Sequence, residues 1–202
     1  MCSCCALFSK LCFRLQVLGR ENIPHTGGFI LASNHVSHLD PILVGCLCPR
    51  QLHYFARISL FTANKLFGWL IASVNTHPIK RGEADRGALD LAEYLVKTNN
   101  GILLFPEGTR SKDGTIGPAK PGIGFIACRT SVPVIPAYVH NSINAMPRDS
   151  KKITCVPVSV YYGKPLIFSL DDANAKGATK EDYINATTTI MDAIRELKAN
   201  AS

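Results

Sequence analysis

The chain has 202 residues, 47% of them hydrophobic and 18% charged, which suits one globular domain and excludes two full-sized ones. Lysine and arginine outnumber aspartate and glutamate by 22 to 15, and the net charge of +7 favours an anionic partner: a phosphorylated substrate, an anionic membrane or nucleic acid. The aromatic residues are few and are not interleaved with basic runs, which argues against nucleic acid.

Eight cysteines are present, but they form no CxxC pair and no ligand set at zinc spacing. No apolar segment precedes a small-residue cleavage site, so we expect no signal peptide and reduced thiols. The longest apolar runs, residues 42–48 and 66–74, fall far short of the ~18 residues that a transmembrane helix requires. We therefore expect a protein that is membrane-associated only peripherally, on the cytoplasmic face.

The chain begins with a mixed apolar and basic segment. Residues 5–18 combine Leu, Phe and Cys with Lys10 and Arg14 at spacings compatible with a short amphipathic helix. Such a helix could lie in a membrane interface or dock on the core. We accordingly separate an amphipathic N-terminal segment, residues 1–16, from a main domain, residues 17–202.

A buried strand followed by a polar corner comes next. Residues 29–32 form an apolar run after two glycines, as an inner strand does, and Asn34 ends it. Asp40 and Pro41 then predict the start of a helix, with Asp40 as its cap. Side chains that leave such a strand often line active sites in α/β proteins, and one of them here is His35.

His35 and Asp40 allow two interpretations. On one continuous helix a five-residue step would turn the two side chains about 140° apart, but across a loop-to-helix corner they can meet. The carboxylate would then accept one imidazole proton and leave the other ring nitrogen basic. In the simpler interpretation Asp40 only caps the helix and His35 is an ordinary loop histidine. This stretch alone favours the simpler one.

The remaining chain alternates strands and helices without internal repeats. Strands are predicted at residues 51–58, 74–81, 102–105, 132–139 and 153–162, the last at a sheet edge, and helices at residues 41–48, 83–97, 121–130 and 179–198. Residues 60–72 are apolar enough for a helix or an interfacial segment. The alternation predicts an α/β fold, a single domain with a mixed, mostly parallel sheet flanked by helices.

Charged residues gather at the ends of these elements. Glu107 and Arg110 follow the strand at residues 102–105 across a turn that Gly108 permits. An arginine fork at such a position suits a phosphate, which it can hold with two parallel hydrogen bonds. Further cations at element ends are Arg57, Arg81 and Lys120. Taken singly, each of them is better explained as a solvated loop charge.

Four blocks in a fixed order resemble a known family. They are Asn34-His35 with Asp40 after four intervening residues, Arg81 after a strand, FPEGTRS at residues 105–111, and VPVIP at residues 132–136. Together they strongly resemble the 1-acylglycerol-3-phosphate acyltransferases of the glycerophospholipid acyltransferase superfamily. The resemblance covers about residues 17–165, and FPEGTRS is its most specific part.

The resemblance implies a role for each matched residue and a glycerol-3-phosphate acyltransferase-like fold. His35 would be the general base, and Asp40 would orient it. The glycerol-phosphate site would contain Glu107, Gly108, Thr109 and Arg110, joined by Arg81, Arg57 and Lys120. Pro133 and Pro136 would shape the acyl-donor site.

The implied reaction transfers a fatty acyl group from acyl-CoA or acyl carrier protein to the sn-2 hydroxyl of lysophosphatidic acid, giving phosphatidic acid. A secondary alcohol needs a positioned base, whereas a thioester is already activated, so no cofactor, metal or covalent enzyme intermediate is expected. Both substrates and an anionic membrane surface are the expected partners. Two alternatives stay open: acyl transfer to another lysolipid or to glycerol-3-phosphate, and a non-catalytic membrane lipid-binding protein.

Overall fold

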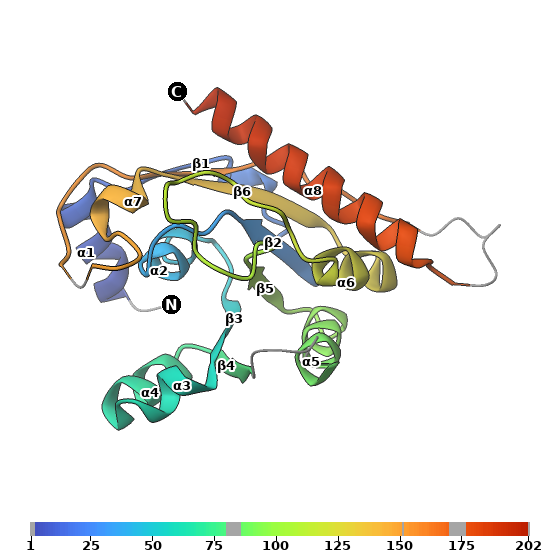
Figure 1. Cartoon of the computed structure of the whole chain (residues 1–202), viewed down its shortest axis with the longest axis horizontal. Helices are drawn as coiled ribbons and strands as arrows, with labels where there is room; N and C mark the ends of the chain where they lie inside the picture. Colours follow the sequence, from blue (N-terminus) through green and yellow to red (C-terminus); the bar gives the residue numbers. More distant parts are fainter. Residues whose placement is uncertain (1–2, 80–85, 151, 170–176, 202) are drawn as a thin grey trace.

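The protein, a computed structural model, is described over residues 3–79, 86–150, 152–169 and 177–201. Seven strands form one sheet in the order β1-β7-β6-β2-β5-β3-β4 (Figure 1). Their bounds are β1 (Gln16–Leu18), β2 (Phe29–Ser33), β3 (Leu52–Arg57), β4 (Thr76–Ile79), β5 (Gly101–Leu104), β6 (Val134–His140) and β7 (Ser159–Tyr162). Every pairing is parallel except that of β6 with β7. The predicted mixed, mostly parallel sheet is confirmed.

Helices cover both faces of the sheet and also project beyond it. They are α1 (Ser3–Phe13), α2 (Asp40–Gly45), α3 (Ile58–Thr62), α4 (Lys65–Ala72), α5 (Arg86–Lys97), α6 (Gly122–Thr130), α7 (Ser142–Ala145) and α8 (Lys180–Asn200), with a 3-10 turn η1 (Arg20–Asn22). In Figure 1, α3 and α4 extend away from the sheet on the ends of β3 and β4. Within the described residues, no helix is long and apolar enough to cross a bilayer.

The central strand β2 explains why the core divides in two. Phe29 and Leu31 join the apolar cluster that includes residues of α1 and α2, whereas Ile30 and Ala32 join the cluster that includes residues of α5, α6 and α8. Successive side chains of a strand point to opposite faces, so β2 is buried along its whole length. Its neighbours β5 and β6 run in the same direction, and the three carboxyl ends therefore meet at one edge.

The structure corrects the predictions at both ends of the sheet. The predicted helix at residues 5–18 ends at Phe13, because Arg14 takes a left-handed conformation (φ 44°) and residues 16–18 instead form β1. β1 pairs with β7, so β7 is not at the sheet edge as predicted. The apolar stretch at residues 60–72 folds into two helices, α3 and α4, rather than one segment.

One cysteine pair also differs from the expectation of reduced thiols. Cys12 of α1 and Cys155, which lies before β7, form a disulfide across a sequence separation of 143 residues. Cys48 and Cys128 are buried thiols outside this disulfide. The spacing of the cysteines could not reveal this pair, because only the packing of α1 beside the segment before β7 brings the two side chains together.

Candidate active site

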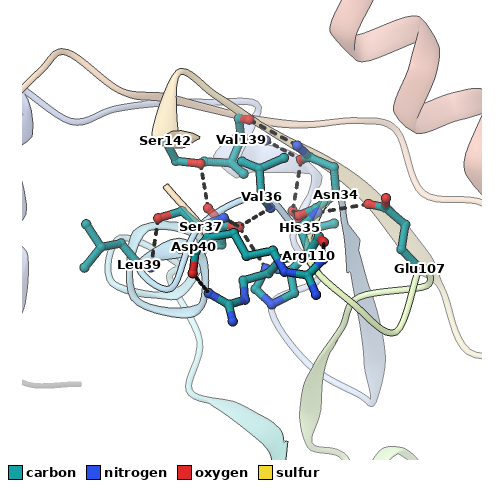
Figure 2. Close-up of polar contacts among 12 residues, drawn as sticks. Asn34, His35, Val36, Ser37, Leu39, Asp40, Glu107, Arg110, Val139 and Ser142 are labelled. Carbon is teal, nitrogen blue, oxygen red and sulfur yellow. Dashed lines mark hydrogen bonds and ion pairs between the residues drawn. The ribbon is translucent and has the colours of Figure 1, made fainter. Parts of the chain in front are cut away.

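His35 and Asp40 meet across the corner between β2 and α2, as the more specific of the two interpretations requires. The distance from His35 Nδ1 to Asp40 Oδ2 is 2.8 Å (Figure 2). A carboxylate can only accept, so Nδ1 carries the ring proton and Nε2 keeps its lone pair. The His35 side chain is 18% exposed and that of Asp40 is fully buried. The pair therefore presents one basic nitrogen at the carboxyl edge of the sheet.

The carboxylate of Asp40 is bonded on both oxygens. Besides His35, Oδ2 accepts the backbone N–H groups of Val36 and Ser37, each at 2.7 Å. Oδ1 accepts the hydroxyl of Ser142 at 2.6 Å, from the first residue of α7. Leu39, not Asp40, is the N-cap residue of α2, so the predicted capping role is wrong. A buried carboxylate needs such partners, and here they also hold it against the imidazole.

Two further contacts fix the orientation of His35. Asn34 Oδ1 accepts the backbone N–H of Val139 at 2.8 Å, and its Nδ2 donates to the carbonyl of Val139, which ties the end of β2 to β6. The ring of Phe105 stacks on the imidazole with a centroid separation of 4.0 Å and an interplanar angle of 17°. The histidine is thus held by its backbone, its ring face and one ring nitrogen.

The turn after β5 is fastened to the His35 loop by backbone hydrogen bonds. Glu107 Oε1 accepts the N–H of His35 at 3.1 Å and Oε2 accepts the N–H of Gly117 at 2.9 Å. The N–H of Ser111 donates to the carbonyl of His35 at 2.8 Å. Burial raises the pKa of Glu107, and the two N–H donors oppose that shift. Both carboxylate oxygens are already occupied, so Glu107 acts here as a connection between the two loops.

Three of the predicted cations gather at this edge. Arg110 lies beside His35 in Figure 2 and is partly buried. Its pKa is lowered by burial and by the positive charges of Arg148 and Arg57, so these three guanidinium groups share one region. Gly108 has a φ of 65°, and a β-carbon there would lie 3.2 Å from Cε of Lys120, which places the lysine over the turn.

The remaining predicted site residues fall elsewhere or outside the described chain. Thr109 is exposed on the same turn as Arg110. Arg81 lies in residues 80–85, outside the described residues. Pro133 precedes β6, and its carbonyl accepts from Ile30, at the opposite end of the sheet from His35. Pro136 is buried in the middle of β6, beside Ala32 of β2. The structure does not bring these two prolines to the His35 side.

Sequence reasoning missed Ser142 and Arg148. Ser142 follows the buried strand β6, whose carboxyl end shares an edge with that of β2, and the polar run at residues 140–142 was the available signal. Arg148 carries no such signal, because it stands in a loop outside the four motif blocks.

The comparisons with known proteins place this α/β fold among the acyltransferase domains. The family model described as Acyltransferase matches residues 14–140, more than half of the chain. The chain therefore belongs to the acyltransferase family, and the resemblance drawn from the four blocks is confirmed at that level.

Two individual relatives within this family carry a more specific name. The chain is 32% identical over 145 residues to the chloroplastic 1-acyl-sn-glycerol-3-phosphate acyltransferase BAT2 of Brassica napus, covering 70% of this chain and 41% of the relative. It is 31% identical to the 1-acyl-sn-glycerol-3-phosphate acyltransferase of Bacillus subtilis, covering 61% of each chain. The chain thus spans less than half the length of the Brassica relative.

A solved structure matches nearly the whole fold. The crystal structure of the 1-acyl-sn-glycerophosphate (LPA) acyltransferase PlsC from Thermotoga maritima superposes with a TM-score of 0.72 at 25% sequence identity. The match covers 96% of this chain and 76% of the other. It confirms the predicted fold class.

Proposed function

We propose that this chain transfers a fatty acyl group from an acyl thioester to the sn-2 hydroxyl of 1-acylglycerol-3-phosphate, producing phosphatidic acid. The observation that carries the proposal is the His35–Asp40 pair, held at 2.8 Å beside partly buried Arg110. The pair supplies a base, and Arg110 supplies a charge for the substrate phosphate. The relatives named as 1-acylglycerol-3-phosphate acyltransferases support the same acceptor.

The proposed mechanism uses His35 as a general base. Nε2 takes the proton of the sn-2 hydroxyl while that oxygen attacks the thioester carbonyl, and Asp40 stabilises the imidazolium that forms. The tetrahedral intermediate then expels the thiolate, which receives the proton back from the imidazolium. The acyl group passes directly between the two substrates, so the scheme contains no covalent enzyme intermediate and requires no metal or cofactor.

An acyl-transfer assay tests this proposal. Purified protein in mixed micelles receives lysophosphatidic acid with oleoyl-CoA or with oleoyl-acyl carrier protein, and phosphatidic acid is measured by mass spectrometry. We expect product with at least one donor and a loss of about 10²–10⁴-fold in the His35→Ala variant. His25→Ala, which removes an exposed histidine, is the matched control and should retain activity. Absence of product with both donors, from folded protein, would contradict the proposal.

We also propose that the enzyme reaches its lipid acceptor through peripheral membrane contact. Helix α4 leaves Leu66, Trp69 and Leu70 exposed by 75%, 68% and 52%, and the chain carries a net charge of +7. Replacing these three side chains with serine should reduce sedimentation with vesicles that contain phosphatidylglycerol. Ile167→Ser, at a site 65% exposed, is the control. Equal sedimentation of the triple variant and wild type would refute this contact.

A further inference from the structure

Arg110 and Arg148 hold each other through a reciprocal pair of hydrogen bonds. Arg110 Nη1 donates to the carbonyl of Arg148 at 3.0 Å, and Arg148 Nη1 donates to the carbonyl of Arg110 at 2.7 Å. Within the described residues, no carboxylate lies at ion-pair distance from either guanidinium. Two like charges are therefore fixed in one place, and each guanidinium keeps N–H groups that these two bonds do not use.

The electrostatic surroundings of this pair are positive. Burial and the charges of Arg148 and Arg57 lower the pKa of Arg110, while Asp149 and Asp40 oppose that shift less strongly. Burial, Arg110 and His35 likewise lower the pKa of His38. Partial burial of like charges costs free energy, and a bound anion would recover it. Among the described residues, the protein itself supplies no carboxylate at ion-pair distance that would neutralise these two guanidinium groups. The pair is therefore arranged to receive an anion from outside the protein.

The segment that carries Arg148 is fastened to the loop that carries His35. The hydroxyl of Ser37 donates to the carbonyl of Met146 at 2.8 Å, two residues before Arg148. The backbone of Arg148 also lies close enough to His38 to oppose the lowering of the pKa of that histidine. These contacts set the second arginine at the same edge as the catalytic histidine, although it lies 38 residues from Arg110 in sequence.

We propose that Arg148 binds the terminal phosphate of the acceptor together with Arg110, and that it selects a phosphate monoester over a phosphodiester head group. A monoester offers three terminal oxygens and a charge of about −1.5 to −2, which two guanidinium forks can share. A phosphodiester offers two such oxygens and a single charge, so it gains less from the second fork. This inference rests on the proposed function, because it assigns the acceptor's phosphate to this pair.

A binding measurement tests the site without catalysis. Thermal unfolding is followed with and without sn-glycerol 3-phosphate, at ionic strength matched with sodium chloride. Ligand that binds the folded state raises Tm, and we expect Arg148→Ala to lose most of the increase that wild type shows. Arg195→Ala removes an exposed arginine of α8 that pairs with Asp192, and this control should keep the increase. An equal increase in Arg148→Ala and wild type would overturn the inference.

Kinetics separate this inference from the proposed function. Arg148→Ala should raise KM for lysophosphatidic acid about tenfold, change kcat less than about threefold, and lower the preference for lysophosphatidic acid over lysophosphatidylglycerol; tenfold corresponds to about 1.4 kcal/mol. Arg148→Lys, which keeps the charge but not the fork, should lie between and serves if the alanine variant does not fold. Phosphatidic acid formation with KM and preference unchanged would overturn only the role of Arg148. Arg148-dependent glycerol 3-phosphate binding without acyl transfer would overturn only the proposed function.

Discussion

The two halves of the candidate site are built in opposite ways. On the His35 side the hydrogen-bonding capacity is used within the protein: Asp40 has partners on both oxygens, and Phe105 covers the imidazole ring. On the arginine side, Arg110 and Arg148 stand together without a carboxylate at ion-pair distance among the described residues.

The difference fits the roles proposed for the two halves, a general base at His35 and a phosphate site at the arginines. A general base must already have one tautomer and one orientation before the substrate arrives, so its partners come from the protein. A phosphate-binding group gains affinity only if its charge has not been neutralised beforehand. The contrast predicts that changes on the two sides have different kinetic consequences, with kcat affected by the first and KM by the second.

The largest effect on activity should come from replacing the carboxylate of Asp40. In Asp40→Asn, an amide N–H can take the place of the carboxylate oxygen that now faces His35 Nδ1 and the backbone N–H groups of Val36 and Ser37. The imidazole would then lose the acceptor that fixes its tautomer. We expect kcat to fall about 10³–10⁴-fold, with KM for lysophosphatidic acid changed far less. Steady-state kinetics check this, with circular dichroism to confirm folding. A variant that lost only affinity would break the comparison.

The Cys12–Cys155 disulfide lies close to the segment that supplies one residue to each half of the site. Cys155 follows the segment that carries Ser142 and Arg148, and the N–H of Thr154 bonds to Ala145 of α7. Cys12→Ser should lower the free energy of unfolding by about 2–5 kcal/mol. Dithiothreitol should lower the Tm of wild type toward that of the variant and leave the variant unchanged. No response of wild-type Tm to the reductant would contradict this.

Removing the Ser142 hydroxyl should also lower kcat, but less than replacing Asp40 does. This variant tests whether Ser142 belongs to the His35 half of the site. Ser142→Ala leaves Asp40 Oδ1 without the hydroxyl that now donates to it, at a cost of about 1–3 kcal/mol. We expect kcat to fall about tenfold with both KM values nearly unchanged, and Ser142→Thr to retain more activity. Thr189→Ala, at an exposed hydroxyl of α8, is the control. A rise in KM instead would place Ser142 with the substrate-binding half.

Glu107 connects the two halves of the site. The smallest effect that we predict is a pH dependence of the protein's stability that comes from this residue. Burial raises the pKa of Glu107 in the folded protein above its usual value. Its contribution to stability is therefore present below the ordinary glutamate pKa of about 4.3 and is lost as pH rises through the folded-state pKa. The stability of wild type relative to Glu107→Gln should decrease across that window, measured by urea unfolding at several pH values. A difference that grew with pH would reverse the assigned sign.

The sequence predicted the local parts of the site well. The apolar run of β2, the corner at His35, and the turn at residues 105–111 all lie within short stretches whose turn residues and hydrophobic patterns specify them directly. Helices α5, α6 and α8 were also predicted to within a few residues, and the clearest of them is α5, whose apolar residues form one periodic stripe.

What the sequence by itself determined is thus the α/β class, the central strand and the corner that carries His35, because these depend on neighbours along the chain. The residue pattern at that corner left open whether His35 and Asp40 meet, and the structure decided it. Only the tertiary structure decided that Ser142 completes the carboxylate from 102 residues away, that Arg148 joins Arg110, and that Cys12 meets Cys155. It also moved β7 from the sheet edge to the interior. Such contacts depend on strand order and register, which many distant parts of the chain set together.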